Sequence, residues 1–135
     1  MNIDQKIRDF LEIVKNKDPK QIADMVADTV ILHTPRFHRP VTDRDHVIAI
    51  LIGITRVVEN LNYSEQRQWH NGRNEIVMEF RGNIGDYQLH GVDIFTFDDD
   101  GKVCELTVMC RPVSALIALG EVEDRMLRDH FGISK

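Results

Sequence analysis

Asp93 is the strongest candidate in this sequence for a residue that does chemistry, because it stands in an otherwise apolar row. If residues 87–98 form a strand, alternate side chains share a face. One face then carries Leu89, Gly91, Asp93, Phe95 and Phe97. An unpaired, ionised carboxylate on such a face is costly, so Asp93 must be paired, hydrogen-bonded or protonated. Two interpretations stay open: a structural Asp bonded to a neighbouring group, or a catalytic pocket Asp with a raised pKa that donates a proton or a hydrogen bond.

Histidine is the second side chain that could do acid–base chemistry here. The unperturbed pKa of imidazole suits a base at neutral pH, and His33 lies one residue before Thr34, near the expected pocket mouth. Strand alternation turns His33 away from Thr34, so an ordinary, partly exposed histidine is the alternative to a catalytic one. His38, in the loop after Pro35, is a further candidate. The sequence has neither an HExxH motif nor the Cys/His spacing typical of zinc, so we expect no metal and no cofactor.

The hydrophobic pattern places these residues in an α+β fold. Apolar residues at helical spacing predict three longer helices, over residues 3–16, 42–58 and 112–128. Asp18-Pro19 predicts the start of a short second helix that carries Ile22, Met25 and Val26. The alternating pattern predicts five strands, over residues 29–34, 61–70, 75–82, 87–98 and 102–110. Short turns join the last four strands, so we expect an antiparallel meander with helices on one face of the sheet.

The two faces of the predicted sheet differ in what can cover them. The face that contains Ile76, Leu89 and Leu106 is the better candidate for the core. The opposite face is too apolar for open water, yet helices that fill the first face cannot cover it. Its apolar residues are Val77, Val92, Ile94 and Met109. We therefore expect an isologous homodimer through this outer face.

Size and charge exclude several classes of protein. The 135 residues fit a single domain, residues 1–135, and the net charge is −5 with no cluster of Lys and Arg, which argues against nucleic-acid binding. The N-terminus lacks the apolar core of a signal peptide, and the longest apolar stretch, residues 47–54, is too short to cross a bilayer. Cys104 and Cys110 lie too far apart on one strand to form a disulfide. We expect a cytoplasmic protein with no membrane partner.

Two segments of the chain resemble one known family. They are Phe10 to Leu51, which includes Ala27-Asp28 and Pro35, and the run Val92-Asp93-Ile94-Phe95-Thr96-Phe97-Asp98-Asp99-Asp100-Gly101-Lys102-Val103. Both are similar, without a gap, to the ketosteroid isomerases of the SnoaL-like and nuclear transport factor 2-like (NTF2-like) superfamily. Asp93 falls on the aspartate of the isomerase oxyanion hole. The resemblance implies a cone-shaped, strongly curved antiparallel sheet wrapped by helices (a cystatin-like fold), an apolar cavity and usually a homodimer.

The resemblance and the strand pattern together indicate a ligand pocket for a small, largely apolar, oxygenated molecule. Its expected lining is Phe10, Thr34, Ile50, Leu51, Trp69, Ile76, Met78, Leu89, Gly91, Phe95, Leu106, Val108 and Cys110. Trp69 shares a strand face with Tyr63 in a part of the chain that matches the isomerases poorly. For both aromatic residues, a place in the pocket or in the dimer contact stays open.

Two catalytic positions of the isomerases are changed in this sequence. Their tyrosine falls on Phe10, which cannot donate a hydrogen bond, and their general-base aspartate falls on Thr34, which is no base at neutral pH. We therefore predict no standard ketosteroid isomerisation. Two hypotheses remain: an isomerase, lyase or hydrolase that uses Asp93 with a relocated base, and a non-catalytic binding protein of the same fold. A purely structural dimerising module is a third, and it would have a filled cavity.

Overall fold

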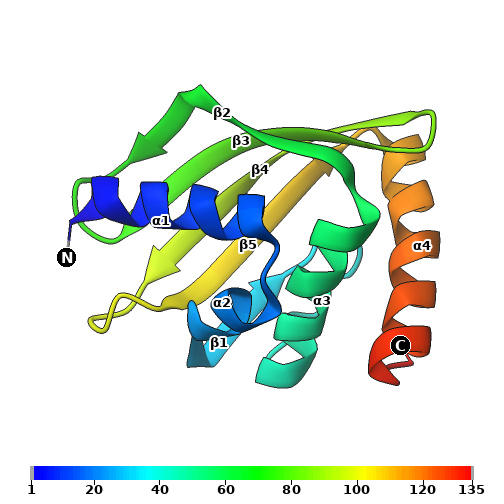
Figure 1. Cartoon of the computed structure of the whole chain (residues 1–135), viewed down its shortest axis with the longest axis horizontal. Helices are drawn as coiled ribbons and strands as arrows, with labels where there is room; N and C mark the ends of the chain where they lie inside the picture. Colours follow the sequence, from blue (N-terminus) through cyan, green and yellow to red (C-terminus); the bar gives the residue numbers. More distant parts are fainter. Residues whose placement is uncertain (1, 135) are drawn as a thin grey trace.

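The computed structural model describes residues 2–134, which form a five-stranded sheet with four helices packed on one face (Figure 1). The helices are α1 (Ile3–Asn16), α2 (Pro19–Asp24), α3 (Arg44–Val57) and α4 (Val113–Phe131). The strands are β1 (Val26–His33), β2 (Glu59–His70), β3 (Glu75–Ile84), β4 (Tyr87–Phe97) and β5 (Val103–Arg111), and they lie side by side in the order β1-β5-β4-β3-β2. The expected α+β class and the expected order of elements are confirmed.

Polar side chains cap the first three helices at their N-termini. Asn2, Asp18 and Asp43 each accept a hydrogen bond from a backbone N–H in the first turn of α1, α2 and α3. Helical spacing then brings one apolar face of α1, with Ile7 and Phe10, down onto the sheet. None of the helices in residues 2–134 is both long enough and apolar enough to cross a lipid bilayer.

β1 differs from the expected strand in its start and in its pairing. It begins at Val26 rather than at Thr29, because the Met25 carbonyl oxygen accepts a hydrogen bond of 2.8 Å from the Val103 N–H and ties the chain to β5. Met25 and Val26, expected on the second helix, therefore lie outside α2. β1 also runs parallel to β5, so the sheet is antiparallel only from β2 to β5.

The inner face of the sheet is the one that the strand pattern predicts. β2, β3, β4 and β5 form the expected meander, and the residues on its helix-covered face are buried. They include Ile76, Met78, Phe80, Leu89, Gly91, Asp93, Phe95 and Leu106. On the outer face, Val77, Val92 and Ile94 are half-buried by their neighbours, and Met109 is 56% exposed. Figure 1 shows no described helix over this outer face.

α4 buries Leu119 as the spacing of its apolar residues predicts, whereas Leu116, Val122 and Met126, also predicted to face inward, are only partly buried. Ile117, expected to face inward, is 60% exposed. The buried positions of the helix are Ala115, Leu119, Gly120, Glu123 and Leu127. A Cβ on Gly120 would lie only 3.0 Å from Nε of Arg36, so the absence of a side chain lets the guanidinium lie directly against the helix. Arg36 thus lies beside Glu123, the one charged residue among the buried positions of α4.

Candidate functional site

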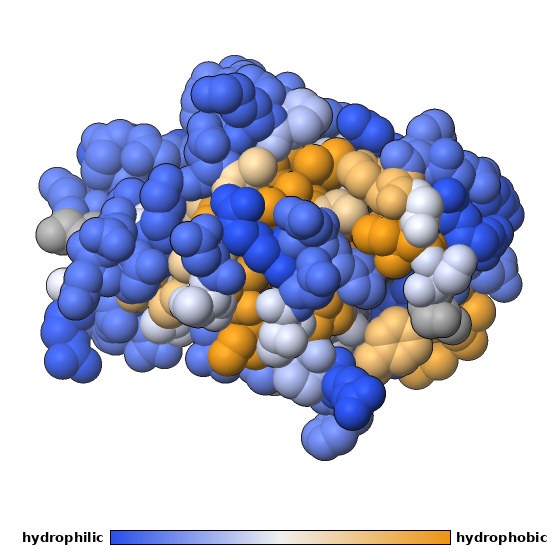
Figure 2. All heavy atoms as spheres, turned by 90° about the horizontal axis from the view of Figure 1, so that it is seen from below, coloured by the Kyte–Doolittle hydropathy of each residue, from blue (hydrophilic) through white to orange (hydrophobic). Residues whose placement is uncertain are grey.

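An apolar cavity lies between the inner face of the sheet and the helices, with a volume of about 90 Å³. Much of the lining expected from the sequence is present. The expected residues that line the cavity are Phe10, Thr34, Ile50, Leu51, Leu89, Asp93, Phe95, Leu106, Val108 and Cys110. Viewed from the end of the molecule where α2, β1 and α3 lie, apolar side chains gather in the middle of the surface between hydrophilic ones (Figure 2).

Four residues expected in the lining are absent from it, namely Trp69, which is described below, and Ile76, Met78 and Gly91. Ile76 and Met78 are buried in the core beside the cavity. Gly91 contributes no side chain, because a Cβ there would clash with the Met109 carbonyl oxygen and the Phe80 ring. The glycine instead leaves room for the Phe80 ring, which lines the cavity. Fewer residues of the sheet thus line the cavity than the strand pattern predicts.

His33 and Trp69 lie away from the cavity. His33 points to the opposite side of β1, where its Nε2 lies 2.7 Å from Oε2 of Glu105. Trp69 is 50% exposed, and the Arg67 guanidinium stacks on its ring at 5.2 Å. The placement of His33 follows from strand alternation, which sends successive side chains to opposite faces. The structure therefore brings neither residue to Asp93.

Asp93 is 5% exposed and accepts a hydrogen bond of 2.5 Å on Oδ2 from the Tyr63 hydroxyl. Burial raises the pKa of Asp93 to about 7, although the hydrogen bond from Tyr63 favours the ionised form and lowers it. Burial, followed by the charge of Asp93, raises the pKa of Tyr63 well above its usual value. Near neutral pH both forms of Asp93 are populated, and the protonated form can donate a hydrogen bond.

Tyr63 is the hydrogen-bond partner of Asp93, and the sequence left open whether it lies in the pocket or in the dimer contact. Tyr63 pairs with Phe80 and Gln68 pairs with Met78, and the register of β2 shifts between the two pairs. Because of this shift Tyr63 faces the cavity, while Trp69, opposite Val77, faces outward. The Phe10 ring meets the Tyr63 ring edge-on at 5.0 Å. The hydroxyl that donates to Asp93 thus comes from β2, and the adjacent Phe10 of α1 has none.

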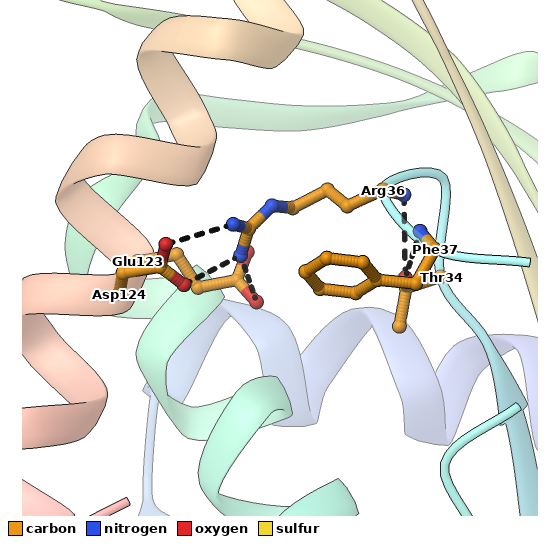
Figure 3. Close-up of polar contacts among 5 residues, drawn as sticks. All are labelled: Thr34, Arg36, Phe37, Glu123 and Asp124. Carbon is orange, nitrogen blue, oxygen red and sulfur yellow. Dashed lines mark hydrogen bonds and ion pairs between the residues drawn. The ribbon is translucent and has the colours of Figure 1, made fainter. Parts of the chain in front are cut away.

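A second polar group of the cavity comes from the loop after β1 and from α4 (Figure 3). Arg36 donates two hydrogen bonds of 2.9 Å to the two carboxylate oxygens of Asp124. Its Nη1 also lies 3.6 Å from Oε1 of Glu123. The Thr34 hydroxyl oxygen accepts from the backbone N–H groups of Arg36 and Phe37 at 3.2 and 3.3 Å, which fixes the turn. Thr34, Arg36 and Glu123 all line the cavity.

Glu123 and Cys110 complete the titratable groups of the lining. Burial raises the pKa of Glu123, and the charge of Arg36 partly offsets the rise. Burial, then the charges of Asp93 and Glu123, raise the pKa of Cys110 to about 12. The thiol is therefore protonated at neutral pH and is a poor nucleophile. In residues 2–134 no three His, Cys, Asp or Glu side chains are grouped so that they could hold a metal ion.

Comparisons with known proteins agree with this fold. The sequence profile of the SnoaL-like domain matches residues 7–106. A steroid delta-isomerase from Pseudomonas aeruginosa is 27% identical, with a TM-score of 0.86, and the match covers 96% of this chain and 94% of that one. An uncharacterised bacterial protein with a cystatin-like fold from Silicibacter pomeroyi is 24% identical, with a TM-score of 0.85 and coverage of 94% and 88%. A search of curated proteins gave no match.

A more distant structure extends the same fold. An NTF2-like protein of unknown function from Cytophaga hutchinsonii is 10% identical, with a TM-score of 0.66, and the match covers 86% of this chain and 96% of that one. The profile match spans well over half of the sequence and includes most of α1 and all of β1, α3 and β4. The resemblance inferred from Phe10–Leu51 and Val92–Val103 is confirmed, and the chain belongs to the SnoaL-like domain family.

Proposed function

We propose that the cavity binds a small, largely apolar molecule through one oxygen atom, which is held by Asp93 and Tyr63. The observation that carries this proposal is the 2.5 Å hydrogen bond between these side chains on an otherwise apolar wall. A buried polar pair needs full hydrogen bonding. When Asp93 is protonated, its carboxyl O–H is not used by the hydrogen bond from Tyr63. This O–H can donate a hydrogen bond to an oxygen atom of a ligand.

The size of the cavity limits the ligand. Pockets for drug-sized molecules have volumes of roughly 300–1,000 Å³, whereas an engineered cavity of about 150 Å³ binds benzene. A cavity of about 90 Å³ is smaller than both, so it holds a short branched chain, or a single ring when lining side chains give way. The similarity to a steroid delta-isomerase suggests an isomerase, but Phe10 and Thr34 at the catalytic positions that the ketosteroid isomerase resemblance implies argue against standard steroid isomerisation. Isomerase, lyase or hydrolase chemistry on such a ligand would each be compatible with the site.

Binding of 4-nitrophenol tests the proposal, because this molecule combines one ring with one hydroxyl oxygen and its absorbance reports its ionisation. The wild-type protein is expected to bind it and to perturb its spectrum. Asp93→Leu and Tyr63→Phe should each weaken binding roughly tenfold, since one hydrogen bond contributes about 1 kcal/mol or more. Asp86→Asn, in the exposed turn after β3, is the matched control. Equal binding by the wild type and Asp93→Leu would refute the proposal.

We also propose that two copies associate through the outer face of the sheet. Trp69 and Met109 are about half exposed there, at 50% and 56%, beside the half-buried Val77, Val92 and Ile94. Glu79 is paired on this face with Arg67 at 2.8 Å and with His90 at 3.0 Å. Paired charges within an apolar face suit an isologous contact, in which each copy meets the same patch on the other. This association would also fit the alternative of a binding module without catalysis.

A further inference from the structure

Glu123 is a buried carboxylate that shares its cationic partner with a second carboxylate. It is 4% exposed, and Arg36 is its only ion-pair partner within 4 Å among residues 2–134, with Nη1 3.6 Å from Oε1. The same guanidinium donates both of its 2.9 Å hydrogen bonds to Asp124. One cation therefore faces two carboxylates, and the bidentate contact belongs to Asp124. A structural counterion for Arg36 is already present without Glu123.

Glu123 lies in a wall that two cavities share. The first is the cavity that contains Asp93, and the second, of about 200 Å³, lies between the loop after β1 and the ends of α3 and α4. Four residues line both: Thr34, Arg36, Ile50 and Glu123. Polar side chains of the second cavity, including His46 and Arg128, make it suitable for water. A proton on Glu123 can therefore exchange with solvent without passing through the apolar cavity.

The two buried carboxylates, Asp93 and Glu123, line the same cavity and both influence the Cys110 thiol there. Cys110, on β5, lines it together with Asp93 and Glu123, and the charges of both carboxylates contribute to the raised pKa of the Cys110 thiol. The environments of the two carboxylates differ. Asp93 accepts a neutral donor, the Tyr63 hydroxyl, whereas Glu123 faces a cation, which favours its ionised form. Burial raises the pKa of both carboxyls, but only Glu123 has a cation that offsets part of the rise, so Glu123 is the better suited of the two to accept a proton.

We propose that Glu123 is the catalytic proton acceptor of this cavity, for a small ketone whose oxygen is bound at Asp93 and Tyr63. This inference rests on the proposed function and adds a reaction to it. A Glu123 oxygen forms a bond to a hydrogen on the carbon next to the carbonyl, and that C–H bond breaks. Its electron pair forms a C=C bond, and the carbonyl π pair moves onto the oxygen. Returning the proton from Glu123 to carbon restores the carboxylate, so no other reactant is consumed.

Arg36 is a positioning residue in this scheme. Its contact with Glu123 holds the carboxylate at the cavity wall, and Asp124 and the Thr34 turn hold Arg36 (Figure 3). Thr34, which falls on the base position of the ketosteroid isomerases, therefore helps to hold Arg36, and Arg36 in turn holds the proposed base on α4. This arrangement moves the acceptor from the first strand to the last helix.

Deuterium exchange into cyclohexanone tests the proposal, because it needs proton removal but no particular product. The wild-type protein in D2O should accelerate loss of the α-hydrogen signals in the NMR spectrum over buffer. Glu123→Gln should lower the protein-catalysed rate by about a hundredfold or more, which is typical for loss of a general base. Its binding of 4-nitrophenol should stay within roughly threefold of wild type. Glu121→Gln, exposed on the same helix, is the matched control and should exchange at the wild-type rate.

Thermal unfolding shows whether each variant is folded. If Glu123→Gln is unfolded, Glu123→Asp is used in its place. Glu123→Asp keeps the charge but withdraws the carboxylate, so exchange should fall while 4-nitrophenol binding persists. Wild-type exchange in a folded Glu123→Gln, or in Glu123→Asp if Glu123→Gln is unfolded, would overturn the proposal. So would 4-nitrophenol binding by a wild-type protein that shows no exchange above buffer, and this result would leave the proposed binding function intact. Failure of 4-nitrophenol to bind would overturn both.

Discussion

Tyr63 reaches Asp93 across an intervening strand. The two residues lie on β2 and β4, with β3 between them, yet the hydroxyl donates a hydrogen bond of 2.5 Å to the carboxylate. Neighbouring strands lie about 4.8 Å apart, so only a long side chain above a curved sheet can make this contact. The ring of Phe80, on β3, lies 5.6 Å from that of Tyr63 and supports it from below.

Removal of the Tyr63 hydroxyl should raise the pKa of Asp93 further. Burial sets this pKa at about 7, and the hydrogen bond from Tyr63 is the opposing influence. In Tyr63→Phe the burial persists while the donor is lost, so ionisation becomes harder. A carbon-13 NMR titration of the Asp93 carboxyl in both proteins measures the change. A pKa that stays the same or falls in Tyr63→Phe would show that the hydroxyl does not stabilise the carboxylate.

The free energy of unfolding should fall as the pH rises from about 4 to above 7. The pKa of Asp93 is about 7 in the folded protein against an ordinary value of 3.8, so in this range the folded state binds the proton and the unfolded state does not. Stability therefore decreases with pH, by up to about 4 kcal/mol for a shift of about three pKa units. Urea unfolding at pH 5 and pH 8 measures the slope. Asp93→Asn should flatten it, and equal slopes in both proteins would contradict the prediction.

The placement of Asp93 is readable from the sequence, but its partners are not. Strict alternation along β4 assigns the carboxylate to the core face, because neither the strand nor its neighbours shift register at that point. Tyr63 and Trp69 would share a face only if β2 were regular, and the register shift between them cannot be read from their spacing. The burial of Glu123 depends on Arg36, which lies far away in the chain. Helical periodicity carries no information about such a partner.

Conversion of a β,γ-unsaturated ketosteroid should not be measurable with the wild-type protein. Phe10 and Thr34 stand at the positions of the isomerase tyrosine and base, and the cavity of about 90 Å³ is too small for four fused rings. The appearance of the conjugated ketone, followed by ultraviolet absorbance, is the measurement. Conversion that disappears in Asp93→Leu would contradict this prediction and assign steroid isomerisation to the site.

A charge on the outer face of the sheet should separate the two copies of the proposed dimer. In Trp69→Glu or Met109→Glu an exposed apolar side chain becomes charged, and burying it unpaired is costly. Light scattering at micromolar concentration should give a dimer mass for the wild type and a monomer mass for both variants. Ile117→Glu, on the exposed side of α4, is the matched control and should remain dimeric. A monomeric wild type would refute the proposed association.

Gly120→Ala should destabilise the protein, although the same change in a helix ordinarily stabilises it by about 0.5–1 kcal/mol. A Cβ at Gly120 would lie 3.0 Å from Nε and 3.2 Å from Cζ of Arg36, which Asp124 holds in place. Because the guanidinium cannot move without losing its bidentate contact, we expect a loss of about 1–3 kcal/mol, the usual cost of overpacking.

Gly53→Ala on α3 is the matched control for this prediction, since its Cβ would meet only Met126 Cγ at an ordinary 3.5 Å. Urea unfolding of the two variants should therefore give changes of opposite sign. In an Arg36→Met background the cost of Gly120→Ala should shrink, because a flexible side chain can give way to the new methyl group. An undiminished cost in that background would mean that the strain comes from elsewhere in α4 and that Gly120 does not seat the arginine beside Glu123.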